Sequence, residues 1–355
     1  MVVVKNLTIS VLLALSAVTS VQADTEQSGT LPDSLSQPAV TSRLAEHSML
    51  SDIARAGQRL VTVGIRGHIL YSDDEGQRWQ QAQVPVSVTL TGVCFADAQR
   101  GWAVGHRGVI LATGDAGQTW QLQLDGNRAA VALVDEARKQ HSELLESAEM
   151  LVEDGADKPF LAVHCASGER AVAVGAYGLA FRTENGGQHW QPSLAALGGT
   201  EQRHINALTV APEGFYLAGE QGGLYRADRA MANVQVMAEP YEGSFFGVLS
   251  AADGSVIAYG LRGHVFRWQG ADADWEQVAV DTTQSLTAGA LLANRAILLA
   301  DAAGAGWYSR DGGRSFRQVK AQSRFSFTAL MPLQGGDVLA VGLRGVTRFQ
   351  ATDLE

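Results

Sequence analysis

Short apolar runs separated by turn residues make up most of the chain from about Met49 onward. Apolar runs of about four to eight residues that are bounded by Gly, Asp or Asn are typical of β-strands. The clearest unit predicts strands over residues 90–95, 102–105, 109–113 and 119–124. The first of these is the most apolar, so we expect it to be the innermost strand, buried on both faces.

This four-strand unit repeats along the chain. Its marker is the first residue of the turn between the second and third strands: Gly64, Gly105, Gly175, Gly219, Gly260, Asp301 and Gly342. The steps between markers are 41, 70, 44, 41, 41 and 41 residues. A period near 41 residues with four short strands per unit is typical of a β-propeller. We therefore predict an all-β, seven-bladed β-propeller over residues 46–350, followed by a short tail at 351–355.

The last unit has its first three strands and no fourth. A ring with an open edge is prone to pair with other chains. Residues 24–45 are rich in Ser, Thr, Gln and Pro, which is typical of a linker or an extended strand. We predict that this segment, at roughly residues 30–45, supplies the missing strand and closes the ring.

The 70-residue step contains an insertion of about 29 residues between the second and third units, at residues 127–157. Asn127 could cap a helix over 129–152, and Gly155 would stop it. Apolar residues such as Val134, Ala137 and Leu151 recur on one face of this helix. Such a face predicts either packing across the propeller face or docking of a partner.

The first 23 residues resemble a secretory signal peptide. Lys5 supplies the initial charge, residues 7–18 are apolar, and Val21-Gln22-Ala23 fits a cleavage site. We expect cleavage after Ala23 and a periplasmic, exported protein. A retained anchor is the alternative, although the apolar run is short for a membrane span. No other stretch is long and apolar enough, so we expect no direct membrane insertion by the mature protein.

Charge and cysteine content narrow the possibilities. The 355-residue chain has a formal net charge of −10, which argues against a nucleic-acid partner. Cys94 and Cys165 lie in the first strands of consecutive repeats and fit no metal spacing. An oxidising compartment would permit a disulfide. Their register differs by one residue, however, which would tend to point them to opposite faces, so two buried thiols are the alternative.

A second motif, Ser/Thr-x-Asp/Asn-x-Gly-x-x-Trp/Phe, lies between the third and fourth strands of four units. Its Asp can accept bonds from nearby backbone N–H groups, and its aromatic residue can pack between blades. We expect a structural role for its residues: Asp74, Gly76, Trp79, Asp115, Gly117, Trp120, Asn185, Gly187, Trp190, Asp311 and Gly313.

This motif matches the Asp box of bacterial-neuraminidase-type repeats. Together with Val-Gly-x-Arg-Gly in the preceding turn, it resembles the propeller family of the photosystem II assembly and stability factor. The helical insertion resembles a branch of that family in non-photosynthetic bacteria. The resemblance implies an exported, non-enzymatic assembly or accessory factor that recognises a membrane protein complex. It further implies that the partner is the periplasmic domain of a resistance-nodulation-division (RND) transporter.

Arginine follows the marker residue by two positions in four units, as Arg66, Arg107, Arg262 and Arg344. Tyr177, Gln221 and Ala303 hold this place in the others. These turns should lie at one end of a propeller, and guanidinium groups suit carboxylate or phosphate recognition. The resemblance adds that an arginine patch binds partners in this family. We therefore predict a partner-binding set of Arg66, Arg107, Tyr177, Arg262 and Arg344; bracing of the neighbouring blade is the alternative.

Two other functions stay open. Sialidases also contain such repeats, and a glycosidase set could combine three arginines with an acid and a nucleophile: Arg66, Arg107, Arg262, Tyr177, Glu220 and Asp301. A glycan or small-ligand module that uses the central channel is the other alternative. His68, His106 and His264 come from different units and form no metal-binding motif. We therefore predict no metal site, no catalytic residue and no cofactor.

Overall fold

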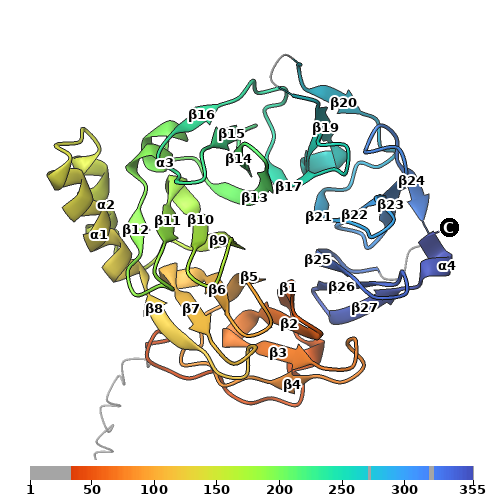
Figure 1. The fold of residues 1–355 in the computed structure, drawn as a ribbon, viewed down its shortest axis with the longest axis horizontal. Coiled ribbons are helices and arrows are strands. Elements are labelled where there is room, and N and C mark those ends of the chain that lie inside the picture. The colour runs from red at the N-terminus through yellow and green to blue at the C-terminus, as the bar shows by residue number, and fades with distance from the viewer. Residues whose placement is uncertain (1–32, 271–272, 320–323, 355) are drawn as a thin grey trace, which may run out of the picture. The chain divides into compact units, whose positions relative to one another are not determined.

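The seven predicted repeats form seven separate sheets arranged as a ring (Figure 1). The structure is a computed structural model that describes residues 33–270, 273–319 and 324–354. The predicted signal peptide at 1–23 and the start of the linker lie outside these residues. The seven-bladed propeller predicted from the 41-residue period is confirmed.

Six sheets have four antiparallel strands and the seventh has three. The first three blades are β1 (Leu50–Ala56), β2 (Arg59–Gly64), β3 (Ile69–Ser72) and β4 (Gln80–Gln81); β5 (Leu90–Phe95), β6 (Gly101–Gly105), β7 (Ile110–Thr113) and β8 (Gln121–Leu124); and β9 (Phe160–Cys165), β10 (Ala171–Gly175), β11 (Ala180–Thr183) and β12 (Gln191–Pro192). The next two are β13 (Ile205–Ala211), β14 (Gly214–Gly219), β15 (Leu224–Ala227) and β16 (Val234–Val236); and β17 (Phe245–Ser250), β18 (Val256–Gly260), β19 (Val265–Trp268) and β20 (Glu276–Val278). The last two are β21 (Leu286–Leu291), β22 (Ile297–Asp301), β23 (Gly306–Ser309) and β24 (Arg317–Val319); and β25 (Phe327–Pro332), β26 (Val338–Gly342) and β27 (Gly345–Phe349).

The insertion folds as two helices, not as the single helix predicted over 129–152. They are α1 (Gly126–Lys139) and α2 (Leu145–Asp154). Asp125 rather than Asn127 caps α1, because its side chain accepts a hydrogen bond from the Arg128 N–H. Gly155 ends α2 with a φ of 75°, as its sequence position predicted. The other helices are α3 (Leu194–Gly199), α4 (Ala351–Leu354) and the short 3-10 helices η1 (Ala45–His47), η2 (Ile65–Gly67), η3 (His106–Gly108), η4 (Ala176–Gly178) and η5 (Leu261–Gly263).

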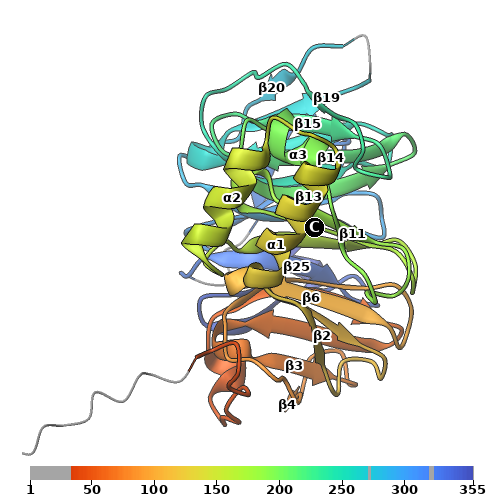
Figure 2. The ribbon, with the colours of Figure 1, turned by 90° about the vertical axis from the view of Figure 1, so that its left-hand side faces the viewer.

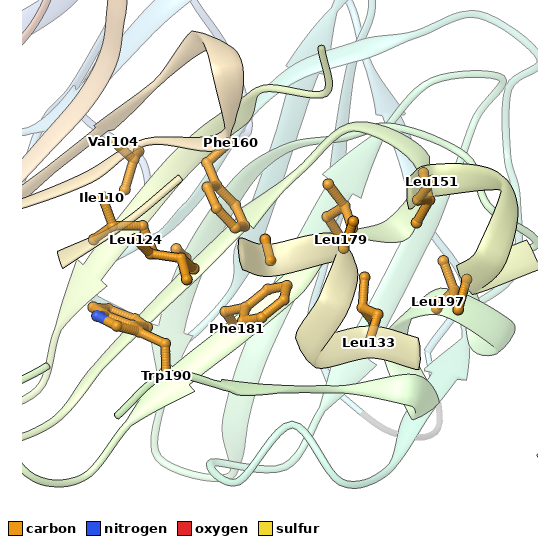
Figure 3. Packing of buried hydrophobic residues seen from close by; sticks show 14 of the residues in the cluster. Val104, Ile110, Leu124, Leu133, Leu151, Phe160, Leu179, Phe181, Trp190 and Leu197 are labelled. Atoms are coloured by element: carbon orange, nitrogen blue, oxygen red, sulfur yellow. The ribbon is translucent and has the colours of Figure 1, made fainter. Parts of the chain in front are cut away.

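The helical pair lies against the outer side of the third blade (Figures 1 and 2). It does not cover the flat face of the wheel. Leu133 of α1 and Leu151 of α2 join a buried cluster with Phe160, Phe181 and Trp190 (Figure 3). Burial of side chains of this size stabilises the fold by about 1.5–3 kcal/mol each. The apolar face that the sequence predicted is therefore used mainly for intramolecular packing.

A repeated hydrogen bond joins the innermost strands of neighbouring blades. Each innermost strand has a register shift after its first residue. In four blades the second residue donates a side-chain hydrogen bond to the first carbonyl of the next blade. These bonds are Thr91 to Phe160, Asn206 to Phe245, Thr287 to Phe327 and Thr328 to Leu50, with donor–acceptor distances of 2.7, 2.8, 2.6 and 2.7 Å. The bulge therefore points a short polar side chain at the adjoining blade.

Within the described residues, from 33 onward, the ring closes between the seventh and first blades without a strand from the N-terminal segment. Residues 33–45 form no strand with β27; the short helix η1 lies against it instead. The prediction of a closing strand is therefore wrong for this part of the segment. The bond from Thr328 to the Leu50 carbonyl closes the ring, together with a shared core that includes Leu60, Leu339 and Val341. Residues 34–42 run beside the first blade, where the Ala39 N–H bonds the Val84 carbonyl.

The Asp-box sequences form near-identical turns, which we call box turns: residues 72–79, 113–120, 183–190 and 309–316. In the first, the Ser72 hydroxyl donates to Asp74 Oδ1 at 2.9 Å and accepts from the Gly76 N–H at 2.9 Å. Asp74 Oδ1 also accepts from the N–H groups of Gln77 and Arg78. Gly76 has a φ of 83°, which a residue with a Cβ would adopt only at a cost. The other three box turns repeat these bonds.

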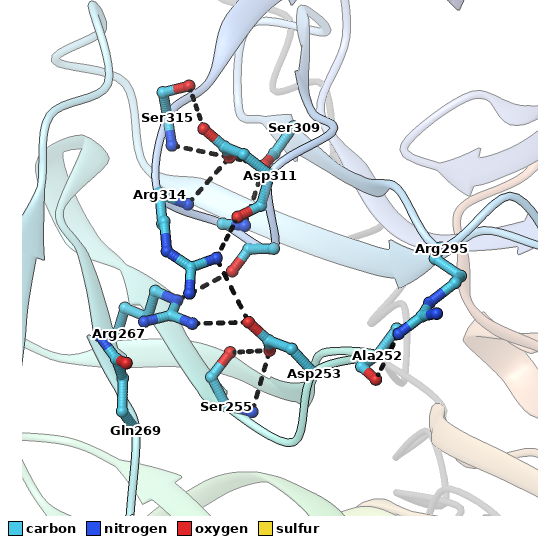
Figure 4. A network of polar contacts seen from close by, with 12 residues as sticks. Ala252, Asp253, Ser255, Arg267, Gln269, Arg295, Ser309, Asp311, Arg314 and Ser315 are labelled. Atoms are coloured by element: carbon cyan, nitrogen blue, oxygen red, sulfur yellow. Dashed lines mark hydrogen bonds and ion pairs between the residues drawn. The ribbon is translucent and has the colours of Figure 1, made fainter.

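Each box turn is also tied to the preceding blade. The carbonyl of its middle residue accepts a side-chain hydrogen bond, as Glu75 from Arg348, Ala116 from Arg59, Gly186 from Gln123 and Gly312 from Arg267. Arg267 is fully buried and also pairs with Asp253 at 2.7 Å (Figure 4). Burial alone would raise the pKa of Asp253, but hydrogen bonds from Ser255 and the charge of Arg267 lower it to about 2. The box turn is therefore a joint between blades as well as a turn within one.

Cys94 and Cys165 form a disulfide with a Cα–Cα distance of 5.7 Å. The sequence argument against it was wrong, because it applied the alternation of one strand to residues of two sheets. Neighbouring blades pack face to face, so side chains that meet point in opposite directions from their own sheets. A register offset of one residue therefore brings Cys94 and Cys165 together. The bond joins β5 to β9 on either side of the helical insertion.

Replacing Thr328 or Thr287 by Val tests whether the closing joint is equivalent to the others. Valine keeps the shape and removes the hydroxyl, so each variant should lower the free energy of unfolding by about 1 kcal/mol. Chemical denaturation of both variants beside the wild-type protein measures this. A Thr328→Val variant as stable as the wild type, beside a destabilised Thr287→Val control, would show that the ring is closed by other means.

Candidate functional site

The turns between the second and third strands carry the predicted partner-binding residues. In the first blade the His68 N–H bonds the Ile65 carbonyl at 3.0 Å, and both residues between them are left-handed: Arg66 has a φ of 56° and Gly67 a φ of 73°. This is a type I′ turn, which favours Asn, Asp or Gly at both central positions. Arg107, Tyr177, Gln221 and Arg262 occupy the same place with φ values of 60, 54, 54 and 57°.

Two glycines allow each turn to pack closely against neighbouring backbone. Gly64 has extended backbone, and a Cβ there would lie 2.3 Å from the Met49 carbonyl oxygen. Gly67 is left-handed, and a Cβ there would lie 2.2 Å from the Val86 carbonyl oxygen. The turn therefore packs on the connection that leads to the next blade. These turns all lie at one end of the wheel, which we call the turn face, because antiparallel strands place them opposite the box turns.

A non-glycine residue in this conformation costs about 1–2 kcal/mol. The turn itself gives no reason for Arg at a place where Gly or Asn would relieve that cost. Arg66 and Arg262 are exposed, and neither guanidinium has a hydrogen bond or ion pair among the residues that the structure describes. The Arg262 backbone N–H bonds Ser285 Oγ of the next blade at 3.4 Å, but neither guanidinium bonds a neighbouring blade within the described residues. Bracing by the side chains therefore does not explain them.

The other predicted residues have partners. Arg107 lies 3.5 Å from the carboxylate of Asp33, and its Nε is buried without a hydrogen bond within the described residues. Arg344 lies in the equivalent turn of the seventh blade, which is one residue shorter, and its guanidinium is 4.2 Å from the Phe325 ring centroid. The predicted set is therefore not uniform: within the described residues, only the guanidiniums of Arg66 and Arg262 are unpaired.

Aromatic rings add to the turn face around Tyr177. This residue is 41% exposed; Lys158 Nζ lies 5.0 Å from its ring centroid and the His204 ring 4.9 Å. In the fifth blade, the rings of Tyr241 and His264 stack at 4.2 Å. Lys158, His204 and Tyr241 lie in connections between blades, which have no repeated pattern, so sequence reasoning missed them. Lys158 is largely buried and pairs with Asp154 and Asp157 at 2.9 and 2.7 Å, so the Tyr177 ring is the main contact surface here.

His68 lies beside Arg66. Burial, and then the charge of Arg66, lower the pKa of His68, whose Nδ1 is 3.2 Å from the Ser48 hydroxyl. The side chain is therefore mainly neutral at pH 7 and adds no positive charge to the turn face.

The glycosidase set does not converge on a free acid. Asp301 is buried, and its carboxylate accepts bonds from the N–H groups of Ala303 and Ala305 and from Trp307 Nε1. Glu220 accepts from the His204 N–H and lies 2.7 Å from His204 Nδ1. Asp301 holds its own turn, and Glu220 ties its turn to the connection before β13, so neither carboxylate is a free acid.

Asp52 is a charged residue of the innermost ring that the sequence analysis missed. Its carboxylate accepts bonds from the N–H groups of Ile53 and Val93, both at 2.8 Å. The equivalent residues in the other blades are small: Gly92, Ala162, Ala207, Gly247, Ala288 and Ala329. Burial raises the pKa of Asp52 to about 6, although the two backbone bonds oppose this. The half-buried carboxylate therefore titrates near neutral pH.

Within the described residues, no group of three or more His, Cys, Asp or Glu is placed to hold a metal ion. No helix of that part combines the length and apolar character that a membrane span requires.

The fold and turns define a seven-bladed propeller with box turns at one end and arginine-bearing turns at the other. The family model described as "Photosynthesis system II assembly factor YCF48" matches residues 71–290, more than half of the chain. The chain therefore belongs to this family. No curated protein sequence matches it.

Solved structures of that family share the fold. "YCF48 bound to D1 peptide" matches with a TM-score of 0.67 and 18% identity, over 88% of this chain and 98% of that one. YCF48 from Cyanidioschyzon merolae matches with a TM-score of 0.65 and 16% identity, over 89% and 99%. The WD40 propeller domain of Doa1 matches with a TM-score of 0.62 and 13% identity, over 89% and 95%. The wheel is thus shared beyond the family.

Replacing Asp52 by Asn tests the titration of the innermost ring. Because folding raises the pKa from 3.8 to about 6, the wild-type protein loses stability as pH rises from about 4 through 6. The full shift corresponds to about 3 kcal/mol; partial exposure of the side chain reduces the expected loss to about 1–2 kcal/mol.

Unfolding by denaturant at pH 5 and pH 8 measures the effect. Relative to Asp52→Asn, the wild-type protein should be less stable at pH 8 than at pH 5. Other titrating groups, such as His68 and His164, are common to both proteins and cancel in this difference. A difference that does not change with pH would contradict the raised pKa.

Proposed function

We propose that this protein is an exported, non-enzymatic assembly or accessory factor that recognises a membrane protein complex through its turn face. The family and the wheel support a scaffold role. A family member has been solved as "YCF48 bound to D1 peptide", so at least one relative binds a peptide. We extend peptide recognition to this chain on the basis of its own turn residues.

One observation carries the proposal. Arg66 and Arg262 are held exposed in a left-handed conformation that other residue types adopt more easily, and their guanidiniums have no hydrogen bond or ion pair among the described residues. Strained residues of this kind persist where function requires them. Two blades that are not neighbours provide the same side chain at the same end of the wheel, so the recognised surface spans much of that end.

The chemistry of the partner follows from the side chains present. A guanidinium binds a carboxylate through two parallel hydrogen bonds, and Tyr177 offers an amphipathic contact surface between them. The chain as a whole carries a formal net charge of −10. An acidic segment would therefore be attracted to the turn face and repelled by much of the remaining surface.

We further propose that the partner is the periplasmic domain of an RND-type transporter. This rests on the family resemblance of the helical insertion, now seen as α1 and α2 on the rim, where α1 contacts the η3 turn that carries Arg107. Export is supported by the Cys94–Cys165 disulfide, since such bonds persist mainly in oxidising compartments.

Site-specific photo-crosslinking tests the proposal in the living cell. A photoreactive phenylalanine replaces Arg66, Tyr177 or, as the control, Arg100, which lies in an exposed turn at the opposite end of the wheel. We expect a membrane protein to crosslink from positions 66 and 177 and not from 100. Mass spectrometry of the crosslinked species identifies the partner, the mature N-terminus and the state of both cysteines.

Each part of the proposal can fail separately. Equal crosslinking from all three positions, or none, would contradict recognition through the turn face. Crosslinking to a membrane protein other than a transporter would leave that recognition intact and overturn the RND assignment. An N-terminus at Met1 with reduced cysteines would contradict export.

A further inference from the structure

The joint between the third and fourth blades contains a cleft of about 340 Å³ at the box-turn end. Arg170, Arg182, Glu184 and Arg229 line it, and Val172 and Phe215 form its apolar wall. This size is within the range of small-molecule sites. The cleft lies at the opposite end of the strands from the turn face, so it is separate from the proposed partner surface.

The fourth blade has no box turn at this joint; the fifth and seventh blades also lack one, whereas the other four blades have one. Arg182 of β11, Arg267 of β19 and Arg348 of β27 hold the same register position, opposite Val172, Ile257 and Leu339 of the adjoining strands. Arg267 and Arg348 each donate to the middle carbonyl of the next blade's box turn. Arg182 would do the same if the fourth blade had one.

The fourth blade has a different turn there. Asp228 organises it by accepting from the N–H groups of Ala230 and Ala232, and no carbonyl of this turn bonds Arg182 within the described residues. Arg182 pairs instead with Glu184, next to its own strand, at 2.7 Å. The space that a box turn fills in other joints is left as the cleft.

Positive charge is concentrated around this space. Arg170 is the counterpart of Arg100 in the second blade, where Asp97 pairs with Arg100 at 2.8 Å. Ser167 replaces that aspartate, so the Arg170 guanidinium is exposed and has no bond in the described part of the chain. Arg229 donates to the Ala211 carbonyl at 3.1 Å. Three guanidiniums thus face one carboxylate, in a protein with a net negative charge.

The opposite wall is apolar and aromatic. Phe215 is 2% exposed, and its ring packs edge-on against His164 at a centroid distance of 5.6 Å. Burial and the charge of Arg229 lower the pKa of His164, which therefore contributes little positive charge near pH 7. A ligand would meet cations on one side and, on the other, an apolar wall in which Val172 and Phe215 are 6% and 2% exposed.

We propose that this cleft binds a small carboxylate with an aromatic or short apolar body. The carboxylate supplies the planar oxygen acceptors that a box-turn carbonyl supplies to the equivalent arginines elsewhere, and the apolar body packs on Phe215. Two oxygens suit the fork of a guanidinium better than a single carbonyl does. The site needs neither the turn face nor a membrane partner.

Titration with 4-fluorobenzoate, followed by ¹⁹F NMR at low ionic strength, tests this. 4-Fluorobenzamide provides the neutral ligand of the same shape, and inorganic phosphate the other common oxyanion. The proteins are the wild type, Arg170→Gln, and Arg100→Gln as the matched control at the equivalent turn. The Arg170 side chain has no bond to lose within the described residues, so its substitution should leave the melting temperature unchanged.

We expect saturable binding of 4-fluorobenzoate to the wild type and to Arg100→Gln, at least tenfold weaker binding to Arg170→Gln, and no saturable binding of the amide. Absence of saturable benzoate binding to the wild type would overturn the proposal. Equal affinity in Arg170→Gln would do the same, because the cleft would not be the binding site. Binding of phosphate in place of benzoate would overturn the assignment of a carboxylate.

Discussion

The joint between neighbouring blades is the interaction on which the whole structure depends. A four-stranded sheet of this size cannot bury both its faces alone, so each blade is stable only against the next. Side chain to carbonyl bonds repeat at two levels of this joint. Residues such as Thr328 bond the innermost strand of the next blade, and residues such as Arg267 bond its box turn.

This repetition explains where the chain can vary. The joint of the second and third blades tolerates a helical insertion because the disulfide and the buried cluster around Phe181 hold it. The joint of the third and fourth blades has no box turn and contains a cleft. The turn face lies at the opposite end from the box turns and is not held by these bonds, so the guanidiniums of Arg66 and Arg262 are available for recognition.

The 41-residue period predicted the wheel, its blade number and most strands, because spacing and apolar runs are local properties of the sequence. Three expectations failed where the outcome depends on tertiary context. The spacing of apolar residues alone could not reveal the break between α1 and α2, where the first helix ends at Lys139 and the second begins at Leu145. Closure by Thr328 and the pairing of Cys94 with Cys165 depend on how two sheets face each other.

The candidate site, like the fold, was predictable only in part. Recurrence identified the arginine positions, but whether a guanidinium is free or paired depends on distant residues such as Asp33 and Phe325. Lys158 and His204 lie in irregular connections and had no signal. Arg170 and Arg182 became visible only by comparison of equivalent positions in the blades, which requires the register of the strands.

The most direct test of the central claim compares stability and recognition in one protein, the Arg66→Asn, Arg262→Asn double variant. Asparagine suits the left-handed turn, so we predict an unfolding free energy equal to or above that of the wild type. Recovery of the crosslinked membrane partner with this variant should fall at least tenfold, whereas Arg100→Asn should behave as the wild type. A double variant that is destabilised by more than about 1 kcal/mol and still captures its partner would show that these arginines brace the wheel rather than recognise another protein.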